Sequence, residues 1–229
     1  MSRRTEVYLE IGAKRTFASA VVWPGWSRSG RTPDEALEAL SASAPRYAAV
    51  ARRARVAFRA PGSVDELVVV ARRTGDGGTD FGVPGVPAPT DGEPLAEADL
   101  KRWRGLLRAA WWAWDAAAES ARGITLRTGP RGGGRTLAKM RTHVLEAEEA
   151  YLHQLGSRRP ALAKDAGEDE RLASVRDAAL AALELLARGE PLPDPNRVRK
   201  AWSPRYFIRR SAWHALDHAW ELEDRSSGG

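Results

Sequence analysis

Residues 103–114 read WRGLLRAAWWAW, and this stretch sets the architecture of the second half of the chain. Its apolar residues recur at i, i+3, i+4, i+7, i+8 and i+11, which places them on one face of an α-helix. Segments with the same kind of apolar spacing follow at residues 137–151, 172–186 and 204–225. Four amphipathic helices of similar length predict an all-α four-helix bundle over residues 95–225.

The first 83 residues have a different pattern, that of a small mixed module. Short runs of β-branched and aromatic residues bounded by Gly or Pro predict strands. These runs lie at residues 7–11, 17–23, 56–58 and 67–71. The Gly-rich turn at residues 74–78 predicts a β-hairpin.

A helix is predicted to begin after Thr32. Thr32 has the chemistry of an N-cap, Pro33 stands at the first helical position, and Glu35 follows the cap by three residues. This combination is typical of helix N-termini. The apolar face continues to Tyr47, and Pro45 is expected to end or bend the helix. The strands and this helix together predict a small α/β sandwich-like module.

A segment rich in Pro and Gly separates the two regions. Residues 82–94 contain four Pro and three Gly and show no helical periodicity, which is typical of a linker between domains. We therefore expect an α+β protein. Its parts would be an N-terminal module over residues 1–83, a linker over 84–94, a helical bundle over 95–225 and a tail over 226–229.

The 229-residue chain contains no cysteine. Disulfides, zinc–thiolate sites and thiol nucleophiles are thereby excluded, so any metal ion must be held by His, Asp or Glu. The formal net charge of +6 is spread over both halves of the chain. A nucleic-acid-binding protein usually concentrates such charge on one face. No apolar run is long enough for a secretion signal or a membrane span. We therefore expect a cytoplasmic protein without a nucleic-acid or membrane partner.

The placement of the histidines is the strongest indication of function. His214 and His218 stand at i and i+4, so both project from one face of the last predicted helix. His143 lies within about 40° of Ala147 on the second helix, at ~100° per residue, and can also face the interior. Three imidazoles in one apolar core need partners, and a divalent metal ion satisfies all three. His153 lies roughly 80° from His143 and is expected to be exposed.

Three carboxylates near the histidines are further candidates. Glu146 follows His143 by three residues and is a candidate fourth ligand or catalytic base, although it lies some 60° off the His143 direction. Asp217 is either an acceptor that orients an imidazole or an ordinary surface carboxylate. Glu221 is either a ligand or the ion-pair partner of Arg225.

Two histidine-containing segments resemble those of a known superfamily. Residues 141–148, RTHVLEAE, and residues 213–220, WHALDHAW, resemble the two His segments of the DinB-like superfamily. Its members are metal-binding four-helix bundles and include thiol-dependent transferases and isomerases that use mycothiol or bacillithiol. The resemblance implies that His143, His214 and His218 are metal ligands, with Zn or Ni expected.

This resemblance implies a divalent-metal-binding protein that acts as a metal-dependent thiol transferase or hydrolase on a small-molecule substrate. Since the chain has no cysteine, the thiol would come from a low-molecular-weight compound such as mycothiol. The sequence leaves open whether the chain is an enzyme and whether it forms a homodimer.

The N-terminal region resembles a second family. Residues 23–26, WPGW, followed by residues 30–36, GRTPDEA, are similar to the strand, turn and capped helix of HicB-like domains over about residues 5–50. In that family the fold binds a partner protein. The resemblance implies an alternative function, a non-enzymatic module that binds protein or nucleic acid and carries a structural helical bundle.

Overall fold

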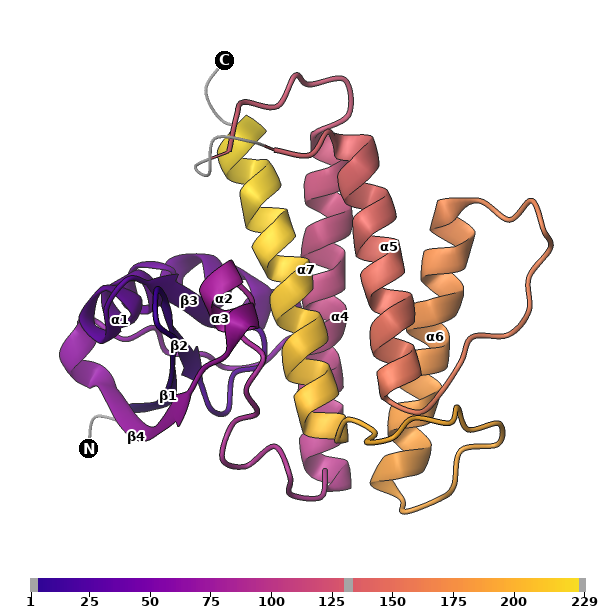
Figure 1. Ribbon diagram of the computed structural model, residues 1–229, viewed down its shortest axis with the longest axis horizontal. Coiled ribbons are helices and arrows are strands. Elements are labelled where there is room, and N and C mark those ends of the chain that lie inside the picture. The colour runs from indigo at the N-terminus through magenta and orange to yellow at the C-terminus, as the bar shows by residue number, and fades with distance from the viewer. Residues whose placement is uncertain (1–3, 130–133, 227–229) are drawn as a thin grey trace.

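A four-stranded sheet and four long helices lie side by side in the computed structural model, which describes residues 4–129 and 134–226 (Figure 1). The protein is therefore α+β, as the sequence predicts. The predicted tail lies outside the described residues except for Ser226, which is the last residue of the final helix. No helix in the described part of the chain combines the length and the apolar character needed to cross a membrane.

The sheet is mixed. Its strands are β1 (Thr5–Ile11), β2 (Thr16–Ala20), β3 (Ser27–Gly30) and β4 (Leu67–Thr74), in the order β3-β2-β1-β4. β1 pairs antiparallel with β2 and parallel with β4. The predicted strands at residues 7–11 and 67–71 are confirmed. The predicted strand over residues 17–23 ends early, at Ala20, because the chain turns through Gly25 at a positive φ of 87° and returns as β3.

The prediction of a hairpin at residues 74–78 is wrong. β4 runs parallel to β1, and the Gly-rich turn starts a short helix, α3 (Gly77–Phe81). The Asp76 carboxylate caps this helix by accepting from the backbone N–H groups of Gly78 and Thr79, a strong local signal for a helix start.

The predicted strand over residues 56–58 is absent from the described sheet. Phe58 instead packs its ring against Trp23, Trp26 and Tyr47, with ring centroids 4.8, 5.2 and 5.3 Å away. This aromatic cluster stabilises the connection between the sheet and the helices that follow it.

Two helices and a short 3-10 turn connect β3 to β4. They are α1 (Pro33–Ala42), α2 (Ala44–Arg53) and the turn Val64–Glu66. α1 begins as the sequence predicts, since the Thr32 hydroxyl accepts from the backbone N–H of Glu35 at 3.2 Å. The helix predicted to continue to Tyr47 is divided at Ser43, and Pro45 stands in the first turn of α2, where its missing N–H costs no hydrogen bond.

Four long helices follow. They are α4 (Glu97–Ser120), α5 (Leu137–Gln154), α6 (Glu168–Ala187) and α7 (Pro204–Ser226), and together they are called the helical layer below. All four predicted helical segments are thus confirmed. α4 packs along α7 and α5 along α6. The apolar face predicted for residues 103–114 is buried in this layer.

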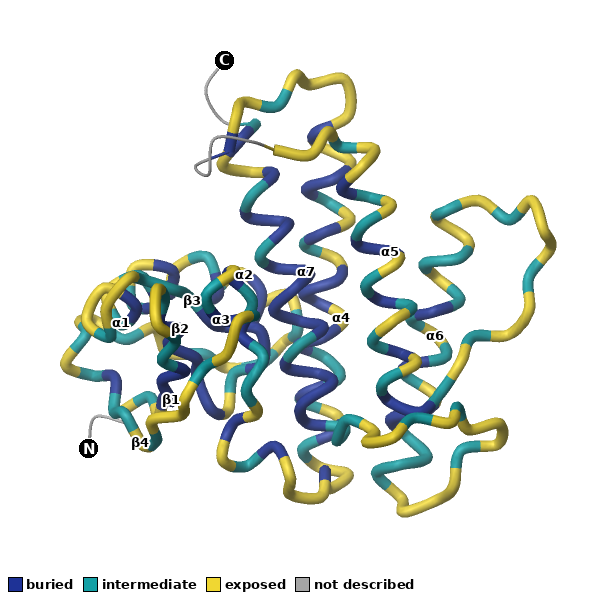
Figure 2. The backbone as a smooth tube through the Cα atoms, in the orientation of Figure 1, coloured by how far each residue is buried: buried dark blue, intermediate teal, exposed yellow. Residues whose placement is uncertain are grey.

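The sheet and the helical layer share one core. The main cluster of buried apolar side chains extends from Val7 of β1 to Leu222 of α7. Figure 2 shows α7 buried along most of its length and buried residues recurring along α4. The segment predicted as a linker over residues 84–94 connects the sheet to the helical layer and is held by hydrogen bonds and an ion pair near both of its ends. Buried Glu10 accepts from the backbone N–H groups of Gly85 and Val86 at 3.0 Å, and Asp91 pairs with Arg209 of α7.

Candidate metal centre

Three histidines from two helices meet inside the helical layer. α7 presents His214 and His218 one turn apart, and α5 presents His143 toward them. The ring centroid of His143 lies 5.1 Å from that of His214 and 5.0 Å from that of His218. The ring centroids of His214 and His218 lie 4.6 Å apart. One ligand nitrogen from each ring lies within 4.8 Å of the other two. The three side chains singled out from the sequence are therefore brought together.

The donor set fits a divalent metal ion. The Nε2 atoms of His143 and His214 are 3.2 Å apart. Two imidazole nitrogens bound tetrahedrally to one ion at about 2.0–2.1 Å would be separated by about 3.3 Å. Three neutral nitrogen ligands leave positions for a further ligand, an arrangement typical of catalytic rather than structural zinc sites. Imidazole suits several first-row ions, so these residues do not select one metal.

The surroundings of His143 and His214 favour the neutral form of these two imidazoles. His214 and His218 are only 6% and 7% exposed. Burial lowers the pKa of His143 to about 4, with a further contribution from the positive charge of Arg135. Burial also lowers the pKa of His214 well below its usual value, and neighbouring His218 and Arg210 act in the same direction. Because only the unprotonated imidazole nitrogen binds a metal ion, this environment favours ligand chemistry.

Glu221 orients one of the three rings. Its Oε2 lies 3.2 Å from Nδ1 of His218, and its Oε1 accepts from the Arg225 guanidinium at 3.0 Å. The His218 contact is the main cause of a lowered pKa for the Glu221 carboxyl. A carboxylate on Nδ1 fixes the tautomer that leaves Nε2 as the ligand atom. Of the two roles predicted for Glu221, the ion pair with Arg225 is present, and the contact with His218 adds a third.

Two of the other candidates do not contact the imidazoles. Glu146 is exposed and belongs neither to the histidine cluster nor to the cavity wall described next. Its rotation around α5 relative to His143 directs it away from the site, so the structure does not support it as a ligand or base. Asp217 lies 3.6 Å from Arg28 and forms an ion pair with it. His153 is exposed, as predicted.

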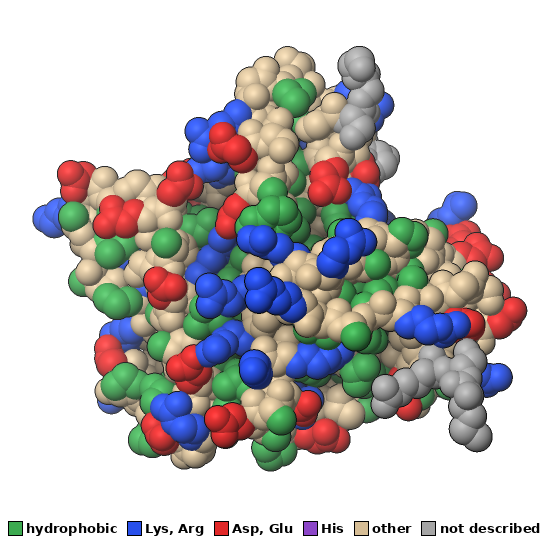
Figure 3. Space-filling model, turned by 180° about the vertical axis from the view of Figure 1, so that it is seen from behind, with side chains coloured by type: hydrophobic (Ala, Val, Ile, Leu, Met, Phe, Trp, Pro, Cys, Tyr) green, Lys and Arg blue, Asp and Glu red, His purple; other side chains and the backbone are tan. Residues whose placement is uncertain are grey.

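A cavity of about 740 Å³ lies over the histidines. Its wall combines α5 and α7 with residues from the N-terminal part of the chain, namely Arg28, Arg46, Phe81, Gly82 and Val83. Figure 1 shows α3, which ends at Phe81, between the sheet and α7. Seen from behind relative to Figure 1, the molecule shows no histidine on its surface, and Lys and Arg side chains gather near the middle of this face (Figure 3).

Sequence reasoning missed this N-terminal contribution to the cavity. A strand, turn and capped helix can be predicted from local signals, but these signals do not indicate which helix of the second half will pack against them. The tryptophans divide by position. Trp213 and Trp220 line the cavity, while Trp103, Trp111 and Trp114 belong to the core, to which Trp220 also contributes.

Comparison with known proteins identifies no relative. No protein-family model, no curated protein and no solved structure matches this chain. The geometry of the histidine site and its cavity therefore provides the basis for a functional conclusion.

Proposed function

We propose that this chain is a DinB-like divalent-metal-binding protein that acts as a metal-dependent thiol transferase or hydrolase. The observation that carries the proposal is the convergence of His143, His214 and His218 at the base of a cavity large enough for a small molecule. A group of three imidazoles, two of them buried and one partly buried, would be costly to desolvate without a metal or another set of partners.

The order of the helices supports the family assignment. His143 lies on the second helix of the helical layer and the HxxxH pair lies on the fourth, as the resemblance to the superfamily implies. In this proposal residues 95–225 form the DinB-like bundle. Residues 1–83 form a HicB-like module joined to it through residues 84–94.

The residues of the site have distinct roles in this proposal. The three histidines would hold the ion, with Zn or Ni expected, and Glu221 would hold His218 in the ligating tautomer. A metal ion bound there supplies a Lewis acid that lowers the pKa of a coordinated thiol or water. Since the chain contains no cysteine, a thiol would have to enter the cavity from outside, and a compound such as mycothiol fits this requirement.

Metal content of the purified chain tests the proposal. We expect elemental analysis of protein without a His tag to find about one divalent ion per chain. We expect His143→Ala, His214→Ala and His218→Ala each to lose it, because three protein ligands are the usual minimum for such a site. His153→Ala is the matched control, since it removes an exposed imidazole from the same helix as His143.

Retention of metal by all three variants would contradict the proposal. The Nε2 atoms of His143 and His214, 3.2 Å apart, would then form a hydrogen bond between two neutral rings. The alternative of a binding module makes the opposite prediction. If the chain is a binding module, the three histidine variants should still bind nucleic acid in a salt-dependent manner or still bind a protein partner.

Glu221→Gln should weaken metal binding without abolishing it. Loss of a carboxylate that orients a ligating histidine typically costs about 10–100-fold in metal affinity. Competition with a chromophoric chelator measures this change. Glu146→Gln is the control, because it removes the same charge from an exposed position outside the cavity. Equal affinities for the two variants would refute the positioning role of Glu221.

A further inference from the structure

One arginine of the cavity wall, Arg210 on α7, has no counter-ion among the residues that the structure describes. Its guanidinium carbon lies 5.3 Å from the ring centroid of Tyr151 and 4.7 Å from that of Trp213. Within residues 4–129 and 134–226 it forms no ion pair, and its Nη1 atom is buried without a hydrogen-bond partner. A cationic donor withdrawn from water without an acceptor costs free energy, so an arriving anion would remove a penalty that is already present.

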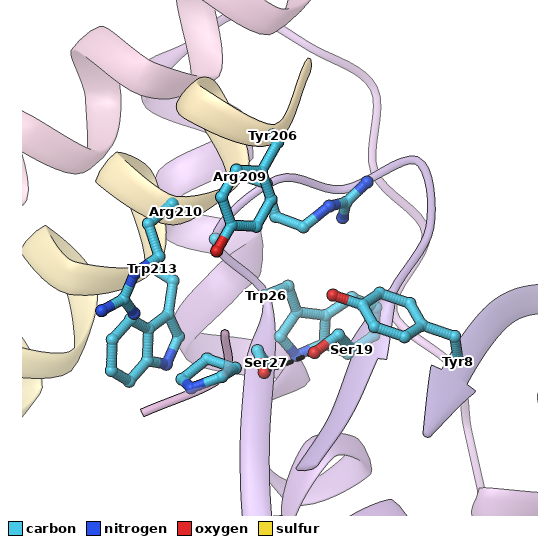
Figure 4. Close-up of a pocket in the computed structure, with 10 residues that line it drawn as sticks. Tyr8, Ser19, Trp26, Ser27, Tyr206, Arg209, Arg210 and Trp213 are labelled. Carbon is cyan, nitrogen blue, oxygen red and sulfur yellow. Dashed lines mark hydrogen bonds between the residues drawn. The ribbon is translucent and has the colours of Figure 1, made fainter. Parts of the chain in front are cut away.

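The adjacent arginine is fully satisfied. Arg209 donates to both carboxylate oxygens of Asp91 at 3.0–3.1 Å and to the carbonyl oxygens of Ala20 and Val21 at 2.7 Å. Figure 4 shows the two side chains leaving α7 in different directions, with Arg210 beside Trp213. The fold therefore provides a complete set of acceptors for one arginine and leaves the next one directed at the cavity.

Two neighbours of Arg210 on the same face of α7 also lack hydrogen-bond partners. The Nε1 atom of Trp213 and the Nδ1 atom of His214 are both buried without a partner among the described residues. Positions 210, 213 and 214 stand at i, i+3 and i+4, so their side chains are neighbours. The Trp213 nitrogen is a donor only, and Nδ1 of His214 is a donor when Nε2 is the ligand atom. These unused groups require acceptors.

The other arginines of the cavity wall that are at least partly buried already have counter-ions. The pairs are Arg28 with Asp217, Arg46 with Asp224, and Arg225 with Glu221. Arg135 and Lys139 also line the cavity, but both are exposed and remain hydrated. Arg210 is therefore the partly buried arginine of the described cavity wall that has no counter-ion, and it stands one helical turn before His214 on α7.

We infer that Arg210 binds an oxyanion of the ligand, a carboxylate or a phosphate-like group, in the part of the cavity next to His214. A guanidinium held between two aromatic rings is oriented in advance to form two parallel hydrogen bonds with such a group. Phe81 lines the same cavity and is 77% exposed, which offers apolar surface to the remainder of the ligand. This inference rests on the proposed function in that the ligand would be the substrate or thiol of the histidine site.

Binding of simple aromatic probes to the full-length, metal-free protein tests the inference. The probes are benzoate, phenylphosphonate and benzamide, which is the neutral counterpart of benzoate, and their dissociation constants are measured by NMR titration. We expect at least one of the two anions to bind on the order of 10-fold more tightly than benzamide, which is typical of a charge-assisted hydrogen bond. The tighter anion identifies the carboxylate or the phosphate-like group as the preferred partner.

Arg210→Met should reduce anion binding to the level of benzamide, and Arg210→Lys should retain part of the preference because the charge remains but the planar fork is lost. The lysine variant decides the outcome if the methionine variant fails to fold. Arg53→Met is the matched control, since Arg53 also lies over a tryptophan, 4.4 Å from the ring of Trp112, but outside the cavity.

The inference is overturned if neither anion binds more tightly than benzamide, or if the Arg210 variants keep the full preference. Because the protein is free of metal, this result is independent of the metal analysis. A parent chain with an intact metal site but no preference for the anions would reject the role of Arg210 alone, whereas a missing metal site would reject the proposed function alone.

Discussion

The Arg209→Met variant is expected to lose about 3–5 kcal/mol of folding free energy relative to the parent chain. Arg209 is 6% exposed and Asp91 is 1% exposed. Their ion pair joins α7 to the segment that precedes α4, and the same guanidinium binds the end of β2 through Ala20 and Val21. Removing the guanidinium leaves the buried Asp91 carboxylate without its counter-ion, with the backbone N–H of Ala88 as a remaining donor, and takes one donor from each of two backbone carbonyls. Loss of one partner is the costly case for a buried pair.

Urea unfolding followed by circular dichroism measures this loss. Arg52→Met is the control, because Arg52 is an exposed arginine on α2. The double variant Asp91→Leu/Arg209→Met should recover part of the stability, since neither charge then remains buried and unpaired. If the single variant loses less than about 1 kcal/mol, the pair is not a main connection between the sheet and the helical layer.

Zinc or nickel added to metal-free protein is expected to raise the midpoint of thermal unfolding by roughly 5–11 °C. At a free metal concentration of about 100 times Kd, binding to the folded state alone contributes about 2.7 kcal/mol. Each kcal/mol corresponds to about 2–4 °C for a chain of this size. The metal would join α5 to α7 through His143 and the HxxxH pair, so it stabilises their packing directly.

His214→Ala should remove this metal-dependent shift, because His214 is the most deeply buried of the three candidate ligands. The midpoint of the metal-free variant is measured first, which separates the loss of the side chain from the loss of the ion. His153→Ala should keep the full shift. A His214→Ala protein that is stabilised by metal as strongly as the parent would place the binding site elsewhere.

Local signals in the sequence were sufficient for the helices of the second half and for the HxxxH pair. The apolar spacing of residues 103–114 and of residues 204–225 depends on rotation within one helix, which the residue pattern encodes directly. His214 and His218 share a face because four residues make slightly more than one helical turn. The position of His143 also followed from rotation around its own helix.

The sequence-based predictions were wrong where the pairing of distant strands, and not the local residue pattern, decides the structure. A Gly-rich turn after β4 is compatible with a hairpin and with a helix start, and the cap formed by Asp76 favours the helix. The parallel pairing of β4 with β1 brings together residues about sixty positions apart, and no local signal specifies such a partner. Glu146 lies outside the cavity wall because a shift of three residues from His143 rotates its side chain around α5.

Arg209 and Arg210 show most clearly which features the sequence determines and which depend on the tertiary structure. The sequence by itself determined that both lie on one helix and point in directions about 100° apart, because helical rotation is a local property of the backbone. Only the tertiary structure decided that Arg209 meets Asp91 and the end of β2, while Arg210 meets two aromatic rings and a cavity. The sequence likewise determined the faces that carry the three histidines. Their convergence, and the wall that the N-terminal residues add, depend on which surfaces pack together, since packing joins residues that are distant in the chain.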